Sequence, residues 1–286
     1  MLVTQTAPAK VNLTLEVLGN RPDGYHEIRS IMQSVNLCDR LTFEPTPSLE
    51  FTCNLPGWQA GRSLVSRAAK LLIAKCDFGG ASISIDKRIP LSSGLGGDSS
   101  DGVATLLGLT RLLQLNLNPE QLLELALSLG SDAPFFLKGG TALAGGRGEN
   151  ISALPPAGGL FLVIMLPGLN VPESKTAALY SRLRPQDYTD GGRTEALVAR
   201  LKAHDPIGAE HLFNVFEGVV YNLLPGLYLY RRAFLSAGAK RVHLAGAGPA
   251  LFSLHHSREE ACAICRKLAG WPVSIAEFLA QGEGSG

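Results

Sequence analysis

The stretch Pro90-Leu91-Ser92-Ser93-Gly94-Leu95-Gly96-Gly97-Asp98-Ser99-Ser100 joins a segment with the pattern of a strand to one with the pattern of a helix. Upstream, residues 81–89 alternate between apolar and polar side chains, and downstream, apolar residues recur at helical spacing from Val103 to Leu113. Glycines let a backbone approach a ligand closely, and the first amides of a helix have no partner within the helix. The stretch therefore predicts a binding site for phosphate groups, which we call the phosphate loop (residues 90–100).

The common phosphate-binding motifs do not fit this loop. A Walker A motif needs Gly-Lys followed by Ser or Thr, and the chain has no Gly-Lys pair. A dinucleotide-binding or protein-kinase loop needs a glycine where this chain has Ser99. Because glycine-rich loops alone are weak evidence, a plain surface connection between a strand and a helix is the alternative interpretation.

The composition limits the classes of protein to which the chain can belong. Its 286 residues suit one large domain or two of ordinary size, and 45% hydrophobic and 18% charged residues are typical of a soluble protein. A net charge of +1 argues against a dedicated nucleic-acid binder. The start of the chain lacks a signal-peptide pattern, and the strongly apolar runs are too short for a bilayer, so we expect a cytoplasmic protein without a membrane partner.

The cysteines indicate reduced thiols, because there are five of them and their spacing is irregular. Cys262 and Cys265 form a C-x-x-C pair in a segment with helical spacing. Without a second pair or a nearby set of histidines, this pair favours packing in the core over a metal or redox role.

Other patterned segments predict the elements around the phosphate loop. Strands are predicted at Val3–Leu18, at Leu160–Leu166, and as a pair within Ser30–Phe43 that turns at Cys38–Arg40. Helices are predicted at Leu64–Ala74, at Asn118–Gly130 and at Asn214–Leu224. The proline- and glycine-rich segment at residues 154–159 is the best candidate for a linker.

The phosphate loop resembles the second motif of the GHMP kinases, approximately P-x-x-x-G-L-G-x-S-S. The matching residues are Pro90, Gly94, Leu95, Gly96, Ser99 and Ser100, with one additional residue between glycine and serine. The resemblance implies that residues 90–100 hold the phosphates of ATP together with Mg²⁺. It spans nearly the whole chain and implies a mixed α/β (α+β) two-domain GHMP kinase fold, with domains at residues 1–155 and 156–286 and the active site in the cleft between them.

Two further segments resemble catalytic motifs of the same family. Lys10 lies in Pro8-Ala9-Lys10-Val11-Asn12-Leu13, and Asp132 lies in a G-x-D-x-P-x-F pattern. From the residues alone, Lys10 can be a solvated charge and Asp132 a helix cap. The resemblance implies that Asp132 accepts or orients the proton of the acceptor hydroxyl, that Lys10 offsets developing negative charge, and that Asn12 contacts the substrate.

The segment Arg21-Pro22-Asp23-Gly24-Tyr25-His26-Glu27 has the chemistry of a turn and can be simply a hairpin with an exposed aromatic ring. It also resembles the signature of those GHMP kinases whose substrate carries a cytidyl group. There the tyrosine stacks on cytosine and the histidine bonds its edge, so Tyr25 and His26 are expected to bind substrate, with Tyr180 on the other face.

The activity that this resemblance implies is ATP-dependent phosphorylation of the 2-hydroxyl of a small alcohol carrying a diphosphocytidyl group, in non-mevalonate isoprenoid precursor synthesis. Alternatives are another small-alcohol kinase of the same family and a nucleotide-binding regulator without catalysis. Tyr25 and His26 argue against the first alternative, and the presence of both Lys10 and Asp132 argues against the second.

The chain departs from the family pattern at three positions. Asp98 stands where a glycine is usual, and Ala245 and Ala247 replace serines in the third motif, His243–Phe252. A carboxylate beside phosphates is unfavourable unless it faces solvent, substrate or magnesium. We expect Asp98 to cap the following helix, and the sequence assigns no metal ligand.

Overall fold

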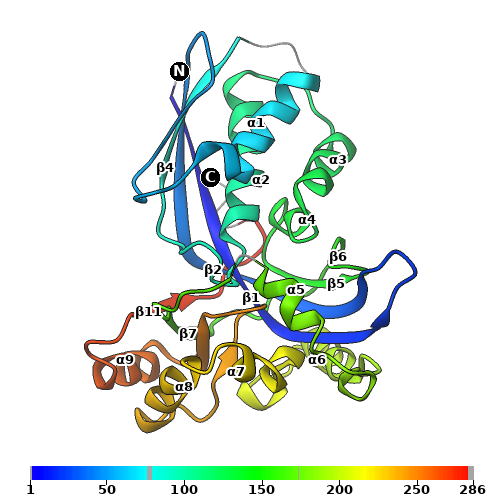
Figure 1. Cartoon of the computed structure of the whole chain (residues 1–286), viewed down its shortest axis with the longest axis vertical. Coiled ribbons are helices and arrows are strands. Elements are labelled where there is room, and N and C mark those ends of the chain that lie inside the picture. The colour runs from blue at the N-terminus through cyan, green and yellow to red at the C-terminus, as the bar shows by residue number, and fades with distance from the viewer. Residues whose placement is uncertain (1, 76–78, 173, 283–286) are drawn as a thin grey trace.

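The computed structural model describes residues 2–75, 79–172 and 174–282 (Figure 1). Within these residues, seven strands form a mixed sheet and four strands form a smaller antiparallel sheet. Helices α1 to α4 lie in one half of the molecule in Figure 1 and α6 to α9 in the other, while β1 and β2 run between the two halves. The fold class predicted from the sequence, a mixed α/β arrangement in two domains, is confirmed.

The larger sheet has the strand order β3-β4-β2-β1-β8, and β5 pairs with both β2 and β6. Its strands are β1 (Val3–Asn20), β2 (His26–Pro45), β3 (Glu50–Cys53), β4 (Ala81–Asp86), β5 (Thr141–Gly145), β6 (Asn150–Ala153) and β8 (Phe213–Asn214). The smaller sheet has the order β11-β7-β10-β9. Its strands are β7 (Phe161–Met165), β9 (His243–Leu244), β10 (Leu251–His255) and β11 (Val273–Glu277).

The helices confirm several boundaries predicted from sequence. The α-helices are α1 (Leu64–Lys75), α2 (Gly97–Leu112), α3 (Pro119–Leu129), α4 (Ala133–Phe136), α5 (Lys175–Tyr180), α6 (Gly192–Lys202), α7 (Val220–Leu223), α8 (Leu227–Ser236) and α9 (Arg258–Lys267). Short 3₁₀ turns are η1 (Ala60–Arg62), η2 (Pro185–Asp187), η3 (Ala209–His211) and η4 (Val215–Gly218). Helix α3 starts as its sequence dictates, because Asn118 and Gln121 form a reciprocal capping box around Pro119.

The predicted strand pair within Ser30–Phe43 is wrong, since β2 continues without a turn through this segment. Asp39 faces Ala7 across the ladder between β1 and β2, and Arg40 faces Asp86 of β4. The carboxylate of Asp39 is fully buried and pairs with Lys87. A polar stretch that looked like a turn therefore stays inside the sheet, because a buried partner satisfies its charge.

The predicted helix at Asn214–Leu224 is also wrong. The segment instead contains the end of β8, the 3₁₀ turn η4 and the short helix α7. The Asn214 side chain accepts a hydrogen bond from the amide of Phe216 and donates two, to the carbonyl oxygens of Leu244 and Gly246. These bonds fix a turn at the point where apolar spacing predicted a continuous helix.

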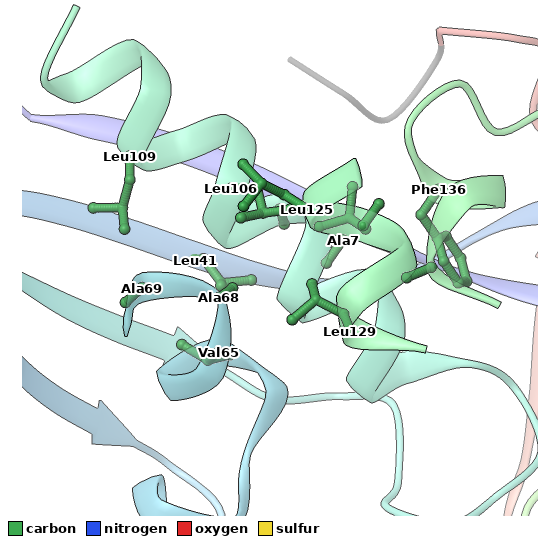
Figure 2. Close-up of a cluster of buried hydrophobic side chains, with 14 of the residues drawn as sticks. Ala7, Leu41, Val65, Ala68, Ala69, Leu106, Leu109, Leu125, Leu129 and Phe136 are labelled. Carbon is green, nitrogen blue, oxygen red and sulfur yellow. The ribbon is translucent and has the colours of Figure 1, made fainter. Parts of the chain in front are cut away.

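Figure 2 shows the hydrophobic core that holds helices α1 to α4 on the larger sheet. Leu106 and Leu109 of α2 pack with Leu125 of α3 and with Leu41 of β2, all of them buried. Each side chain of this size, when fully buried, stabilises the folded state by roughly 1.5–3 kcal/mol. The core therefore fixes α2, and with it the phosphate loop at its N-terminus.

Strand β1 belongs to both halves of the molecule. Ala9, Val11 and Leu13 pack in a cluster with residues of β7, β10 and α6, whereas Val3 and Ala7 pack under α1 to α4. The boundary expected between residues 155 and 156 falls in the coil between β6 and β7 and stays a prediction. None of the described helices is long and apolar enough to cross a membrane.

Candidate active site

A cavity of about 250 Å³ lies between the two halves of the chain. Lys10 and Asn12 enter it from β1, Asp132 from the turn before α4, Tyr180 from α5, and Gly246 from the turn between β9 and β10. Its position agrees with the inter-domain active site expected from the sequence.

Lys10 and Asp132 form an ion pair at the wall of this cavity. The Lys10 ammonium nitrogen lies 3.2 Å from Asp132 Oδ2, although the two residues are far apart in the sequence. The Lys10 side chain is almost fully buried, whereas 36% of the Asp132 side chain is exposed. The carboxylate can therefore contact a substrate in the cavity, while the buried lysine pairs with it on the protein side.

The Asn12 amide sets the direction of Lys10. Asn12 Oδ1 accepts a hydrogen bond from the Lys10 ammonium at 2.8 Å, and Asn12 Nδ2 donates to Ser30 Oγ at 2.7 Å. The Ser30 hydroxyl in turn donates to the carbonyl oxygen of Thr14. Because these hydrogen bonds follow one another from Lys10 through Asn12 to Ser30, the ammonium group is held in one orientation. Asn12 thus acts on Lys10, besides lining the cavity where a substrate contact was predicted.

Asp132 does not serve as a helix cap, the alternative that its sequence left open. It is the residue before α4, but its side chain makes no capping hydrogen bond within the described residues. Gly130, in an extended conformation with φ 156°, ends α3 and lets the chain turn toward the cavity. The carboxylate instead pairs with Lys10 and lines the cavity, where a substrate can reach it.

The phosphate loop turns sharply by means of left-handed residues. Ser92, Gly94 and Gly96 have φ values of 54°, 88° and 73°. Helix α2 begins at Gly97, earlier than expected, because Asp98 was predicted to precede the helix. A second cavity, of about 110 Å³, is lined by residues of the loop itself. They are Pro90, Ser92, Ser93, Gly94, Gly96, Gly97, Asp98 and Ser99.

The remaining predicted loop residues point elsewhere. The Leu91 side chain is exposed, Leu95 is buried in the core, and the Ser100 hydroxyl is buried without a hydrogen-bond partner in the part of the chain that the structure describes. The Leu95 carbonyl accepts a hydrogen bond from the Lys10 amide at 2.8 Å, which ties the loop to β1.

The third motif packs directly on the phosphate loop. A Cβ atom at Gly94 would lie 2.1 Å from the carbonyl oxygen of Ala245, so only glycine fits there. The Ala250 amide donates to the Ser93 carbonyl at 3.0 Å, and the Asn214 side chain holds the carbonyl of Gly246. The loss of serine hydroxyls at Ala245 and Ala247 therefore leaves this contact intact, because backbone atoms make it.

The aromatic residues expected around a cytosine lie together in part. The His26 ring stacks on the Tyr180 ring with centroids 4.7 Å apart, and Tyr180 meets Phe216 edge-on. Burial, with the charge of Asp132, raises the pKa of Tyr180 to about 12, so its phenol stays protonated. Burial also lowers the pKa of His26, which makes a neutral imidazole the main form at pH 7.

Tyr25 lies at the outer edge of this site. Its side chain is 54% exposed, and the guanidinium of Arg147, which lines the cavity, covers its ring at 4.6 Å. The Tyr25 amide donates to Asp23 Oδ1, and Arg21 pairs with both Asp23 and Glu27. The turn is thus held in place, with one face of the Tyr25 ring covered by Arg147 and the residue otherwise exposed.

Asp98 corrects a further expectation. The residue that caps α2 is Gly96, and no side chain caps this helix. Asp98 lies in the first turn with its side chain half exposed, 4.0 Å from the Lys87 ammonium, and lines the phosphate-loop cavity. A negative charge is favourable at a helix N-terminus and beside a lysine. The fold can therefore accommodate the Asp98 carboxylate although that side chain does not cap α2.

Sequence reasoning missed three basic residues. Arg147 and Lys175 line the main cavity, and Lys87 lies buried under the phosphate loop. An isolated lysine or arginine is usually a solvated surface charge, so the pattern carried no signal for them.

Comparison with known proteins places this fold and site among characterised families. Residues 63–140 match the family model for the GHMP kinases N terminal domain. A 4-diphosphocytidyl-2-C-methyl-D-erythritol kinase of Dehalococcoides mccartyi is 47% identical over 254 residues, which are 88% of this chain and 89% of the relative. One from Pelobacter propionicus is 38% identical over 284 residues, which are 97% and 99% of the two chains.

Solved structures agree. The crystal structure of a 4-(cytidine 5'-diphospho)-2C-methyl-D-erythritol kinase has a TM-score of 0.80 and 34% identity, covering 96% of this chain and 98% of that chain. A homoserine kinase from Cytophaga hutchinsonii has a TM-score of 0.75 at 22% identity over 99% and 96% of the two chains, which supports the fold alone. The chain has the fold of a GHMP kinase. Within that class, the chain belongs to the 4-diphosphocytidyl-2-C-methyl-D-erythritol kinase family.

Proposed function

We propose that this protein transfers the terminal phosphoryl group of ATP to the 2-hydroxyl of 4-diphosphocytidyl-2-C-methyl-D-erythritol, giving the 2-phosphate and ADP in non-mevalonate isoprenoid synthesis. The observation that carries this proposal is the Lys10–Asp132 pair, 3.2 Å apart, in a cavity that shares its wall with the phosphate loop. Asp132 takes up or orients the proton of the acceptor hydroxyl, and Lys10 offsets charge that develops on the phosphoryl oxygens. Phosphoryl transfer of this kind depends mainly on positioning and electrostatics.

The loop has the features that nucleotide phosphates require. Its left-handed glycines, Gly94 and Gly96, and the first residues of α2 line the phosphate-loop cavity, where backbone amides can meet phosphate oxygens. Mg²⁺ would neutralise the phosphates when bound. No group of three or more His, Cys, Asp or Glu side chains in the described residues forms a metal cage. The ion would thus be held mainly by the nucleotide, with Asp98 as the carboxylate that lines the phosphate-loop cavity.

The aromatic residues determine the specificity for the acceptor substrate. Tyr25 offers the ring face that Arg147 does not cover, and Tyr180 the face that does not carry His26, as surfaces on which a cytosine can stack. Neutral His26 can bond a base edge. The four cysteines in the described residues are free. Free thiols suit a reducing compartment, and we place the enzyme in the cytoplasm.

The test is the release of ADP from Mg·ATP with a panel of acceptors: the cytidyl substrate, mevalonate, homoserine and galactose. We expect turnover with the cytidyl substrate and at least a hundredfold lower kcat/KM with the others, since about 3 kcal/mol of stacking corresponds to that factor. Equal activity on mevalonate or homoserine would assign a different small-alcohol kinase. Nucleotide binding without turnover on any acceptor would favour a non-catalytic regulator.

A further inference from the structure

Lys175, the first residue of α5, is a buried cation that the proposed reaction does not yet use. Only 4% of its surface is exposed, and its ammonium group donates a hydrogen bond to the Ser92 carbonyl oxygen at 2.9 Å. Among the charges of the described residues that act on it, Lys10 is prominent and no carboxylate appears. Buried charges are normally paired, so this arrangement is costly without an anion.

The position of Lys175 indicates where that anion lies. Ser92, Gly94 and Gly96 line both the main cavity and the phosphate-loop cavity, so the two cavities meet along these residues. Lys175 bonds to Ser92 at this junction and lines the main cavity together with Lys10. Burial and the charge of Lys10 lower the pKa of Lys175 to about 8, so an anion beside the ammonium would favour its charged form.

The Ser92 contact shows that Lys175 is directed toward the loop. Ser92 adopts φ 54°, a left-handed conformation that is unfavourable for a residue other than glycine. An ammonium group has three donors, and the Ser92 carbonyl takes one of them. Within the described residues the ammonium has no further hydrogen-bond acceptor, so its other donors can meet oxygen atoms of a ligand in the junction.

We propose that Lys175 binds the terminal phosphoryl group of the nucleotide, as a second cation beside Lys10. The proposal rests on the proposed kinase function and adds a residue to the site. The terminal group is favoured over the other phosphates because Lys175 faces the cavity that contains Asp132, where the acceptor hydroxyl has to meet the group being transferred. In this role Lys175 stabilises the negative charge on the phosphoryl oxygens, while its hydrogen bond to the Ser92 carbonyl holds the ammonium against the loop.

The experiment compares the binding of Mg·ATP and Mg·ADP to the whole protein by calorimetry, without any acceptor. Lys175→Met removes the charge at nearly constant volume, and Lys202→Met on the exposed side of α6 is the matched control. We expect Lys175→Met to weaken Mg·ATP binding by about tenfold to a hundredfold, the range for a charge-assisted hydrogen bond, and to change Mg·ADP binding less than about twofold. Lys202→Met should change neither.

The possible outcomes separate the roles. An equal loss for both nucleotides would overturn the proposal and leave Lys175 as a residue that only positions the loop, and no loss for either would overturn it too. Lys175→Gln keeps a donor for Ser92 without the charge, and it gives the same comparison where the methionine variant does not fold. Wild-type protein that binds Mg·ATP but phosphorylates no cytidyl substrate would contradict the proposed function while the nucleotide comparison still decides this inference.

Discussion

The Lys87 ammonium nitrogen lies 2.7 Å from Asp101 Oδ2 in the interior of the protein, and the carboxylate of Asp39 accepts a second hydrogen bond from it. The three side chains are almost fully buried. Asp39 also accepts hydrogen bonds from the backbone amides of Arg88 and Ile89. This cluster joins β2, the segment after β4 and the start of α2, and it thereby sets where the phosphate loop lies relative to the sheet.

Replacing Lys87 with methionine should destabilise the protein by about 3–5 kcal/mol, because two buried carboxylates lose their counter-charge. Urea unfolding at pH 7.5 measures the effect. The matched control is Arg88→Met, which removes an exposed pair with Asp86 and should cost about 0–1 kcal/mol. Equal stability of the two variants would mean that the cluster is not a structural support.

The loss in Lys87→Met should depend on pH. Burial already raises the pKa of Asp101 well above its usual range, and removing the lysine raises it further. The folded variant then binds a proton that the unfolded chain has released, so its free energy of unfolding falls as pH rises. Unfolding at pH 5.5 and 7.5 should show a smaller deficit relative to wild type at the lower pH.

Asp132→Asn should lower kcat by about a hundredfold to ten-thousandfold, the usual contribution of a positioned base, while Mg·ATP binding stays within a few-fold of wild type. The asparagine keeps the size of the side chain and its neighbour Lys10. Steady-state kinetics and calorimetry on one preparation separate the two effects. Turnover within a few-fold of wild type would remove Asp132 from the catalytic role.

Tyr25→Ala should weaken the cytidyl substrate by roughly 5- to 150-fold, the value of about 1–3 kcal/mol for a base stacked on an aromatic ring. Tyr25→Phe is the control, since it keeps the ring and should bind nearly as well as wild type. The KM for Mg·ATP should not change in either variant. An equal loss for both substrates in Tyr25→Ala would place the tyrosine at the nucleotide.

The pKa of Lys175, about 8, predicts a basic limb in the pH profile of kcat/KM for Mg·ATP. Below this pH the ammonium is charged and can bind phosphate, and above it the charge is lost, so kcat/KM should fall by up to about tenfold per pH unit. Among the described residues, the other charged or titratable groups that line this cavity are Lys10, Asp132, Arg147 and Tyr180. Lys175→Arg stays charged and should keep its kcat/KM to higher pH.

The contribution of Lys175 to the free energy of unfolding should rise above pH 8, where kcat/KM falls. A free lysine has a pKa of 10.5, so between about pH 8 and that value the unfolded chain holds a proton that folded Lys175 has lost. The contribution of Lys175 to the free energy of unfolding therefore rises with pH. A fall in activity above pH 8 that coincides with unfolding would contradict the assignment of the limb to Lys175.

The sequence predicted those parts of the fold and site that local chemistry decides. The cap of α3 at Asn118 with Pro119 after it, and the cavity position of Lys10 and Asp132, follow from short motifs. Residues whose role depends on distant partners were not predicted. In the sequence, Asp39 has the pattern of a turn, and only the structure shows that Lys87 neutralises it inside the sheet. Lys175 has the pattern of a surface charge, and only the structure shows that it contacts the phosphate loop.

Asp98 stands in the phosphate loop where the family pattern has glycine. Its position in the structure predicts an effect of its substitution on ATP and Mg²⁺ binding rather than on the helix cap. It does not cap α2, and its half-exposed carboxylate lines the cavity in which we place the phosphates. Burial raises its pKa, and Lys87 at 4.0 Å opposes that shift. A negative charge here repels ATP but attracts a cation that ATP carries.

Asp98→Asn should therefore bind free ATP more tightly than wild type and gain less from added Mg²⁺. The measurement is the ratio of ATP dissociation constants without and with saturating Mg²⁺, which we expect to fall by about tenfold if the lost interaction is worth about 1.4 kcal/mol. Asparagine keeps the side-chain volume, and the half-exposed Asp98 carboxylate lies at the 4.0 Å limit of an ion pair with Lys87, so the melting temperature should change little. Glu120→Gln, in the first turn of α3 and away from the phosphate loop, is the matched control and should leave the ratio unchanged. A variant whose ratio equals that of wild type, with a clearly lower melting temperature, would return Asp98 to a purely structural role at the start of α2.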